Sequence, residues 1–107
     1  MRKLRKPEVD LITFLLKGNS KANHFIDGLP NVLVEKMKDG GMGSLRFVSA
    51  KENRLFGEEV AEISLQDIDG MPVFISINLD QDGDIFELDV FKGDFSPLKQ
   101  FPVAPYS

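Results

Sequence analysis

Apolar residues recur with two different periods along the chain. In the N-terminal part the period is that of a helix. From Pro7 to Lys17 the apolar positions repeat every three or four residues and share one helical face. Pro7 suits a first helical turn, and Gly18 suits the position just after a helix end. We therefore predict an amphipathic helix over Pro7–Lys17. Its core-facing residues are Val9, Leu11, Ile12, Leu15 and Leu16.

A second, short helical turn is predicted after this helix. Asn19 or Ser20 can cap it with a side-chain oxygen, and Gly28 and Pro30 end it. The turn carries His24, the only histidine of the chain. We expect this ring to lie on the helical surface rather than to act in acid–base chemistry.

Beyond residue 31 the period changes to two, which is typical of strands. Val32–Met37 and Leu45–Val48 flank a glycine-rich loop and are predicted to form a hairpin. Three further runs follow, in which apolar residues alternate with polar ones, and acidic Asp-x-Asp-Gly turns separate them. These runs are Val60–Gln66, Val73–Leu79 and Ile85–Phe91, and in the last one Phe86, Leu88 and Val90 are expected to face the core.

Together these elements predict an α+β domain that comprises residues 1–107. The helix packs on one face of an antiparallel, mostly meandering sheet of about five strands, because such short turns cannot hold the crossovers of parallel strands. The length fits a single hydrophobic core. The proline-rich tail over Asp94–Ser107 cannot join a central strand, but Phe95, Leu98 and Phe101 are expected to pack on the body of the domain.

Composition narrows the class of protein. The chain has no cysteine, which excludes disulfides, a thiolate nucleophile and cysteine-ligated metal centres. No apolar run approaches the roughly 18 residues of a membrane span, and the basic start MRKLRK is not followed by the apolar stretch of a signal peptide. We therefore expect a soluble, cytoplasmic protein that contacts no membrane and uses no cofactor.

Charge is distributed unevenly along the chain. Residues 1–54 hold 11 Lys or Arg and 6 Asp or Glu, a balance of +5, whereas residues 55–107 hold 2 and 11, a balance of −9. This polarity can hold the two halves together or steer a charged partner. Nucleic-acid binding is not expected, because the acidic half repels phosphates and the short basic run near the N-terminus has no aromatic residues interleaved with it.

The alternation also predicts which side chains point away from the core. Most of the outward set is acidic or hydrogen-bonding, and two aromatic residues lie among them. Exposed aromatics beside carboxylates are typical of a protein-binding surface. The alternatives are that the helix, the tail or a second copy of the chain in a homodimer covers the two rings. The predicted partner-binding face comprises Glu62, Phe74, Ser76, Asn78, Glu87, Asp89 and Phe91, with Ser64 and Gln66 on the same side.

The acidic turn near residue 82 also partly fits the template of a calcium-binding loop. Asn78, Asp80 and Asp82 fall on its first three ligand positions and Gly83 on its bend, and Asp84 adds a further carboxylate. However, Asp89 stands where a bidentate glutamate is usual, and strands rather than helices flank the segment. An acidic hairpin turn is therefore the favoured interpretation, and a divalent-metal site in this turn or at Glu62, Glu87 and Asp89 is the alternative.

No motif in the sequence points to an enzyme. There is no Gly-x-Ser-x-Gly elbow and no phosphate-binding loop of the Gly-x-x-x-x-Gly-Lys-Ser/Thr type. Carboxylates on an open sheet face lack the enclosure that shifts pKa values toward catalytic use. We therefore predict a non-enzymatic interaction module whose partner is a protein, and the acidic face suits a basic one.

Two stretches resemble a known family. Asp39–Phe47 and Phe86–Leu98, the second with the pattern Glu-Leu-Asp-x-x-Lys-x-Asp-Phe-Ser-Pro-Leu, are similar to a family of small, uncharacterised bacterial domains. Phe91 stands where that family is expected to have tryptophan, which is a conservative change. The family has no established activity, so the resemblance implies no functional residues. In general type, an acidic α+β domain of this size also resembles the immunity proteins of bacterial toxin systems.

Overall fold

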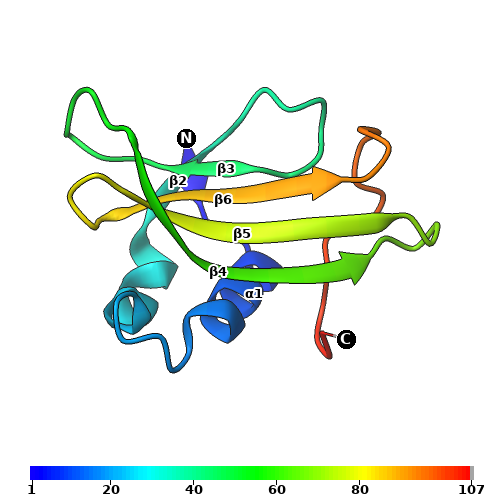
Figure 1. Cartoon of the computed structure of the whole chain (residues 1–107), viewed down its shortest axis with the longest axis horizontal. Helices are drawn as coiled ribbons and strands as arrows, with labels where there is room; N and C mark the ends of the chain where they lie inside the picture. Colours follow the sequence, from blue (N-terminus) through cyan, green and yellow to red (C-terminus); the bar gives the residue numbers. More distant parts are fainter. Residues whose placement is uncertain (107) are drawn as a thin grey trace.

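The computed structural model describes residues 1–106 and places one antiparallel sheet in front of two helices (Figure 1). The α+β class predicted from the sequence is confirmed. No helix within these residues is long and apolar enough to cross a membrane. The elements are β1 (Arg2–Lys3), α1 (Lys6–Leu16), the 3-10 helix η1 (Asn23–Asn31), β2 (Leu33–Lys36), β3 (Leu45–Phe47), β4 (Phe56–Gln66), β5 (Pro72–Asp80) and β6 (Ile85–Lys92).

The sheet has six strands in the order β1-β2-β3-β6-β5-β4, and all neighbours are antiparallel. The prediction of about five strands missed β1, which is too short to show a period. The prediction of a meander holds for β4, β5 and β6 and of a hairpin for β2 and β3, whereas α1 and η1 separate β1 from β2 in the chain. The two sets of strands are joined through the β3–β6 pair, where Leu45 lies opposite Leu88.

Helix α1 forms where its apolar stripe predicts. Leu11, Ile12 and Leu16 are fully buried. At the start of the helix, Glu8 accepts a hydrogen bond from the backbone N–H of Arg5 at 2.7 Å and a bidentate pair from the Arg2 guanidinium at 2.7 and 2.8 Å. Burial alone would raise the pKa of Glu8, but these donors outweigh it and lower the pKa. The carboxylate therefore fixes the N-terminal strand to the helix.

The second helical segment differs from its prediction. It is a 3-10 helix that runs through Gly28 and Pro30, where the sequence predicts an end. Burial explains the difference, because Leu29 is completely buried and fixes this turn against the core. A 3-10 turn bonds over three residues rather than four, so a proline late in the segment interrupts little.

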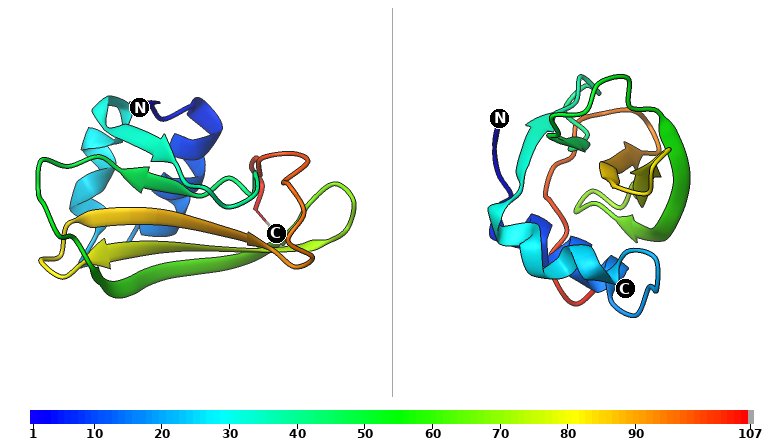
Figure 2. Two further views of the ribbon diagram at one scale, coloured as in Figure 1. Left: turned by 90° about the horizontal axis from the view of Figure 1, so that it is seen from above. Right: turned by 90° about the vertical axis from the view of Figure 1, so that its left-hand side faces the viewer.

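The sheet curves around the core, and α1 and η1 cover its open side (Figure 2). Leu88 and Val90 face this core as predicted, but Phe86 is buried outside the main core cluster. The register shifts after the Asn78–Glu87 pair, so Phe86 is an extra residue in β6. Its ring lies between two guanidinium groups, at 5.0 Å from Arg46 and 4.8 Å from Arg54.

The C-terminal tail packs on the body of the domain, as predicted, through Leu98 and Phe101. Phe95 is the exception, because 67% of its surface is exposed. Its φ of +64° is in the left-handed region, and the tail changes direction there. The ring therefore lies on the outer side of the sheet, edge-on to Phe91 with 4.9 Å between ring centroids.

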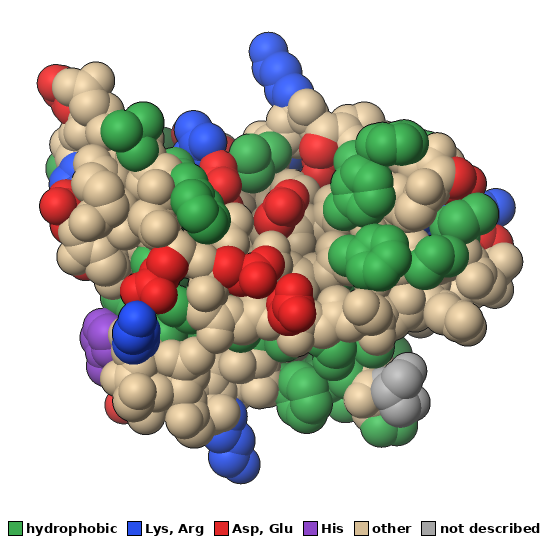
Figure 3. Space-filling model, in the orientation of Figure 1, with side chains coloured by type: hydrophobic (Ala, Val, Ile, Leu, Met, Phe, Trp, Pro, Cys, Tyr) green, Lys and Arg blue, Asp and Glu red, His purple; other side chains and the backbone are tan. Residues whose placement is uncertain are grey.

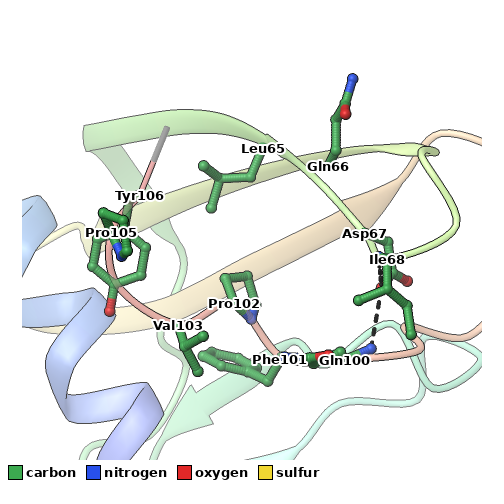
Figure 4. Close-up of a pocket in the computed structure, with 10 residues that line it drawn as sticks. All are labelled: Leu65, Gln66, Asp67, Ile68, Gln100, Phe101, Pro102, Val103, Pro105 and Tyr106. Atoms are coloured by element: carbon green, nitrogen blue, oxygen red, sulfur yellow. Dashed lines mark hydrogen bonds between the residues drawn. The ribbon is translucent and has the colours of Figure 1, made fainter.

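A buried ion pair, which the sequence analysis missed, fixes the tail to the β4–β5 turn. Lys92 is completely buried, and its ammonium lies 2.8 Å from both Asp67 and Asp69. Asp67 also accepts the backbone N–H groups of Lys99 at 2.7 Å and Gln100 at 3.1 Å, and Figure 4 shows the second of these bonds. Burial alone would raise the pKa of Asp67, but the ammonium and the backbone donors lower it to about 2.

Candidate functional site

The outer surface of β4, β5 and β6 holds a shallow groove of about 430 Å³. Figure 3 shows this side of the molecule, with acidic side chains over its middle and hydrophobic ones toward the right-hand ends of the strands. Five of the seven residues predicted for the partner-binding face border the groove, together with Glu59. We refer to these six residues as the acidic–aromatic face: Glu59, Glu62, Phe74, Ser76, Asp89 and Phe91.

The aromatic end of this face is open to solvent. Phe74 is 46% exposed and Phe91 is 36% exposed, although the two rings are neighbours with centroids 6.2 Å apart. Within residues 1–106 the tail contacts these two rings through Phe95, which packs edge-on against Phe91 and leaves both rings partly exposed. Phe95 extends the aromatic cluster from the tail, and the alternation that predicts the other two rings gives no signal for it, because Phe95 lies beyond the end of β6.

The acidic end of the face has no cationic partner within the described residues. Glu59 and Glu62 on β4 and Asp89 on β6 form no ion pair there. Burial raises the pKa of Asp89, the charges of Glu87 and Asp39 act in the same direction, and the Ser44 hydroxyl opposes them from 3.4 Å. The face thus carries negative charge that the rest of the domain does not neutralise.

Six of the ten ion pairs within residues 1–106 join the two halves of the chain. Arg46 lies 2.6 Å from Glu87, and Lys21 lies 3.0 Å from Glu58. The opposite charges of the halves therefore serve in part to hold them together, which is one of the two roles predicted from the sequence. The carboxylates of the acidic–aromatic face remain outside this pairing.

Two predicted members of the partner-binding face lie apart from the groove. Asn78 is only 7% exposed, which corrects its predicted accessibility to a partner, although both of its neighbours along β5 are in the core and its side chain therefore lies on the outer side. It lies between Glu59 and Glu87 in the sheet, beside register shifts in both neighbouring pairs, and such bulges bend and twist a sheet so that neighbours cover one another. Glu87 is half-buried and its charge is neutralised by Arg46.

The acidic turn between β5 and β6 is a hairpin, as favoured by the sequence analysis. Lys51 lies 2.7, 3.0 and 2.8 Å from Asp80, Asp82 and Asp84. Burial would raise the pKa of Asp80, but Lys51, Arg54 and the backbone donors of the turn lower it far more. The turn carboxylates thus share an ammonium of the chain itself, and no cluster of His, Cys, Asp or Glu within residues 1–106 has the arrangement of a metal site.

Two substitutions in this turn should distinguish the contribution of charge to stability from that of backbone geometry. Asp82→Asn is expected to change the free energy of unfolding by less than about 0.5 kcal/mol, because its carboxylate is exposed and its ion pair is screened. Gly83→Val should lower it by about 1 kcal/mol or more, because residue 83 has a φ of +85°. Urea unfolding of both variants measures the difference, and equal effects would contradict this assignment.

These features define a small α+β domain with a curved six-stranded antiparallel sheet and an acidic groove on its outer surface. Residues 1–102 match the family described as a domain of unknown function (DUF6984), and the chain belongs to this family. No match was found among curated proteins or among solved structures.

Proposed function

We propose that this domain is a non-enzymatic protein-interaction module that binds a basic segment of another protein on the acidic–aromatic face. The observation that carries the proposal is the presence of two exposed phenylalanines, Phe74 and Phe91, beside three carboxylates that form no ion pair within residues 1–106. A few residues supply most of the affinity of a protein interface, and aromatic side chains are enriched at interface cores. Unpaired charge speeds association with a partner of opposite sign. Neutralising or escorting a basic protein is a role that fits such a surface.

Charge favours a different protein over a second copy of the chain. Two acidic–aromatic faces placed against each other would bring Glu59, Glu62 and Asp89 close to the same residues of the other copy. Like charges at an interface cost several kcal/mol on general grounds. A segment with lysine or arginine relieves this repulsion and can place its cations over the aromatic rings.

Alanine substitution of the two rings tests the proposal. A displayed library of random 12-residue peptides is selected on the unmodified chain, and the enriched peptides are expected to carry net positive charge. Phe74→Ala and Phe91→Ala should each weaken binding of these peptides by about 2 kcal/mol, roughly 30-fold, which is in the range of interface hot spots. Calorimetric titration measures the change.

The matched control is Phe56→Ala, because Phe56 is also exposed but does not line the groove. It should leave the affinity unchanged. Thermal melts at two protein concentrations complete the test: a large, concentration-independent loss of stability in both groove variants would show that the rings support the fold instead. Melting temperatures that rise with the concentration of the unmodified chain would indicate a homodimer.

A further inference from the structure

Strand β4 forms the long free edge of the sheet. It contains 11 residues, is the last strand in the sheet order and pairs only with β5. At residue 60 the side chain of Asn19 donates a hydrogen bond to the backbone carbonyl of Val60 at 2.7 Å. Within residues 1–106, no loop or side chain forms a hydrogen bond with the backbone of residues 61–66.

This edge has little of the usual protection against strand addition. Natural edge strands are blunted by charged side chains, especially lysine, by proline or by bulges, and Glu62 is the one charged residue of Ala61–Gln66. The bulges of β4 lie at its beginning, where the register shifts between Phe56 and Glu58 and between Glu59 and Ala61. From Ala61 to Gln66 the strand pairs regularly with β5, and this stretch contains neither lysine nor proline. Its unpaired backbone groups can therefore hydrogen-bond to another extended segment.

Two depressions, each lined by both apolar and polar residues, follow one another along this edge. The first, of about 390 Å³, lies between the end of α1 and the stretch Val60–Ile63. The second, of about 340 Å³, lies between Leu65 and the C-terminal tail, and its residues are labelled in Figure 4. Exposed apolar side chains border both: Phe14 the first, and Ile68 and Val103 the second.

On the outer side of the same stretch the chemistry is different. Glu62 and Ser64 point outward, and Ser64 lies directly opposite Phe74 in the register. Because Ser64 is small, a long cationic side chain on an added strand can extend across it toward the Phe74 ring. Glu62 is the nearest carboxylate for a second cation. One side of an added strand would thus meet depressions bordered by exposed apolar side chains, and the other side would meet an acidic, aromatic surface.

We propose that the partner binds as an extended segment that adds a strand to the sheet along Ala61–Gln66, with apolar and basic side chains in alternation. This inference rests on the proposed function and specifies how the partner contacts the acidic–aromatic face. The apolar side chains enter the two depressions, and the basic ones face Glu62 and Phe74. A second copy of β4 fits this edge poorly, because it would bring its own glutamates at positions 58, 59 and 62.

The test uses the acetylated and amidated heptapeptide Lys-Val-Arg-Ile-Lys-Val-Arg and measures its affinity by calorimetry. The matched control, Lys-Arg-Lys-Arg-Val-Ile-Val, has the same composition without alternation and should bind at least tenfold more weakly. N-methylation of alternate peptide residues removes backbone donors on one side of the strand. We expect one set of alternate positions to weaken binding at least tenfold and the other set to be tolerated, with slowed hydrogen exchange at residues 61–66.

The outcomes distinguish this inference from the proposed function. Suppose that N-methylation is tolerated equally at both sets of positions, while Phe74→Ala and Glu62→Gln still abolish binding. This result would overturn strand addition and leave the acidic–aromatic face as the site. If N-methylation weakens binding at only one set of positions, and both protein variants still bind the peptide fully, strand addition is supported and the proposed function is overturned. Absence of heptapeptide binding at about 1 mM would overturn strand addition, and the library selection would still decide the proposed function.

Discussion

Replacing Asp67 with alanine is expected to lower the free energy of unfolding by about 3 to 5 kcal/mol. The side chains of Asp67 and Lys92 are both inaccessible to solvent, so the variant leaves a buried ammonium without its fully buried partner. It also removes the acceptor for two backbone donors of the tail, at Lys99 and Gln100. Urea unfolding at neutral pH measures the loss, and the tail should become more sensitive to proteolysis.

Asp69→Ala is the matched control, because Asp69 contacts the same ammonium but is partly exposed. Its effect should be much smaller, and equal losses in the two variants would contradict the assigned role of Asp67. Folding lowers the pKa of Asp67 to about 2, so its contribution is complete above the unfolded value of about 3.9 and is lost as the pH falls toward 2. The loss of stability over that range should therefore be shallower in Asp67→Ala than in the unmodified chain.

Replacing Gly57 with alanine should cost about 3 kcal/mol of stability, at the upper end of the usual range for overpacked sites. An added Cβ at this position would lie 2.1 Å from the backbone carbonyl oxygen of Asp80 and 2.6 Å from its carbon. These are backbone atoms of the neighbouring strand, which cannot rotate away as a side chain does. The bulge at the start of β4 would therefore have to open.

Gly28→Ala provides the comparison for this second variant. An added Cβ at Gly28 meets no atom within 4 Å, and its φ is not in the left-handed region. The change should alter stability by less than about 1 kcal/mol. Thermal or urea unfolding of both variants gives the difference, and similar values at the two positions would show that β4 and β5 can separate at Gly57 without cost.

The spacing of apolar residues was enough to predict α1 and the three long strands, because each of these elements buries one face and leaves the other polar. It could not predict the order of the strands, since alternation specifies which side of a strand is buried but not which strand lies next to it. The burial of Lys92 had a signal that was overlooked. Residue 92 continues the core-facing series of Leu88 and Val90, so a lysine there needs a buried acid.

The outward positions of Glu62, Phe74, Ser76, Asp89 and Phe91 also followed from alternation. The expected exposure of Asn78 was wrong, because both neighbouring strands have bulges beside it and such bulges, which bend the sheet, are not visible in a hydrophobic pattern. Glu59 was missed for the same reason, since it lies between the two register shifts of β4. Phe95 joins the aromatic cluster because its backbone has a left-handed conformation, which is hard to predict from sequence for a residue other than glycine.

The pairing of β3 with β6 affects how the chain is completed during synthesis. Helix α1 and strands β1 to β3 are made first, but the strand that covers the free edge of β3 ends only at Lys92. Until the ribosome has released that strand, the apolar face of α1 and the edge of β3 remain without their final neighbours. Non-local strand pairs close late because the intervening loop must first be ordered. The nascent N-terminal half is therefore the stage of this protein's life most exposed to misassociation and most in need of chaperone protection.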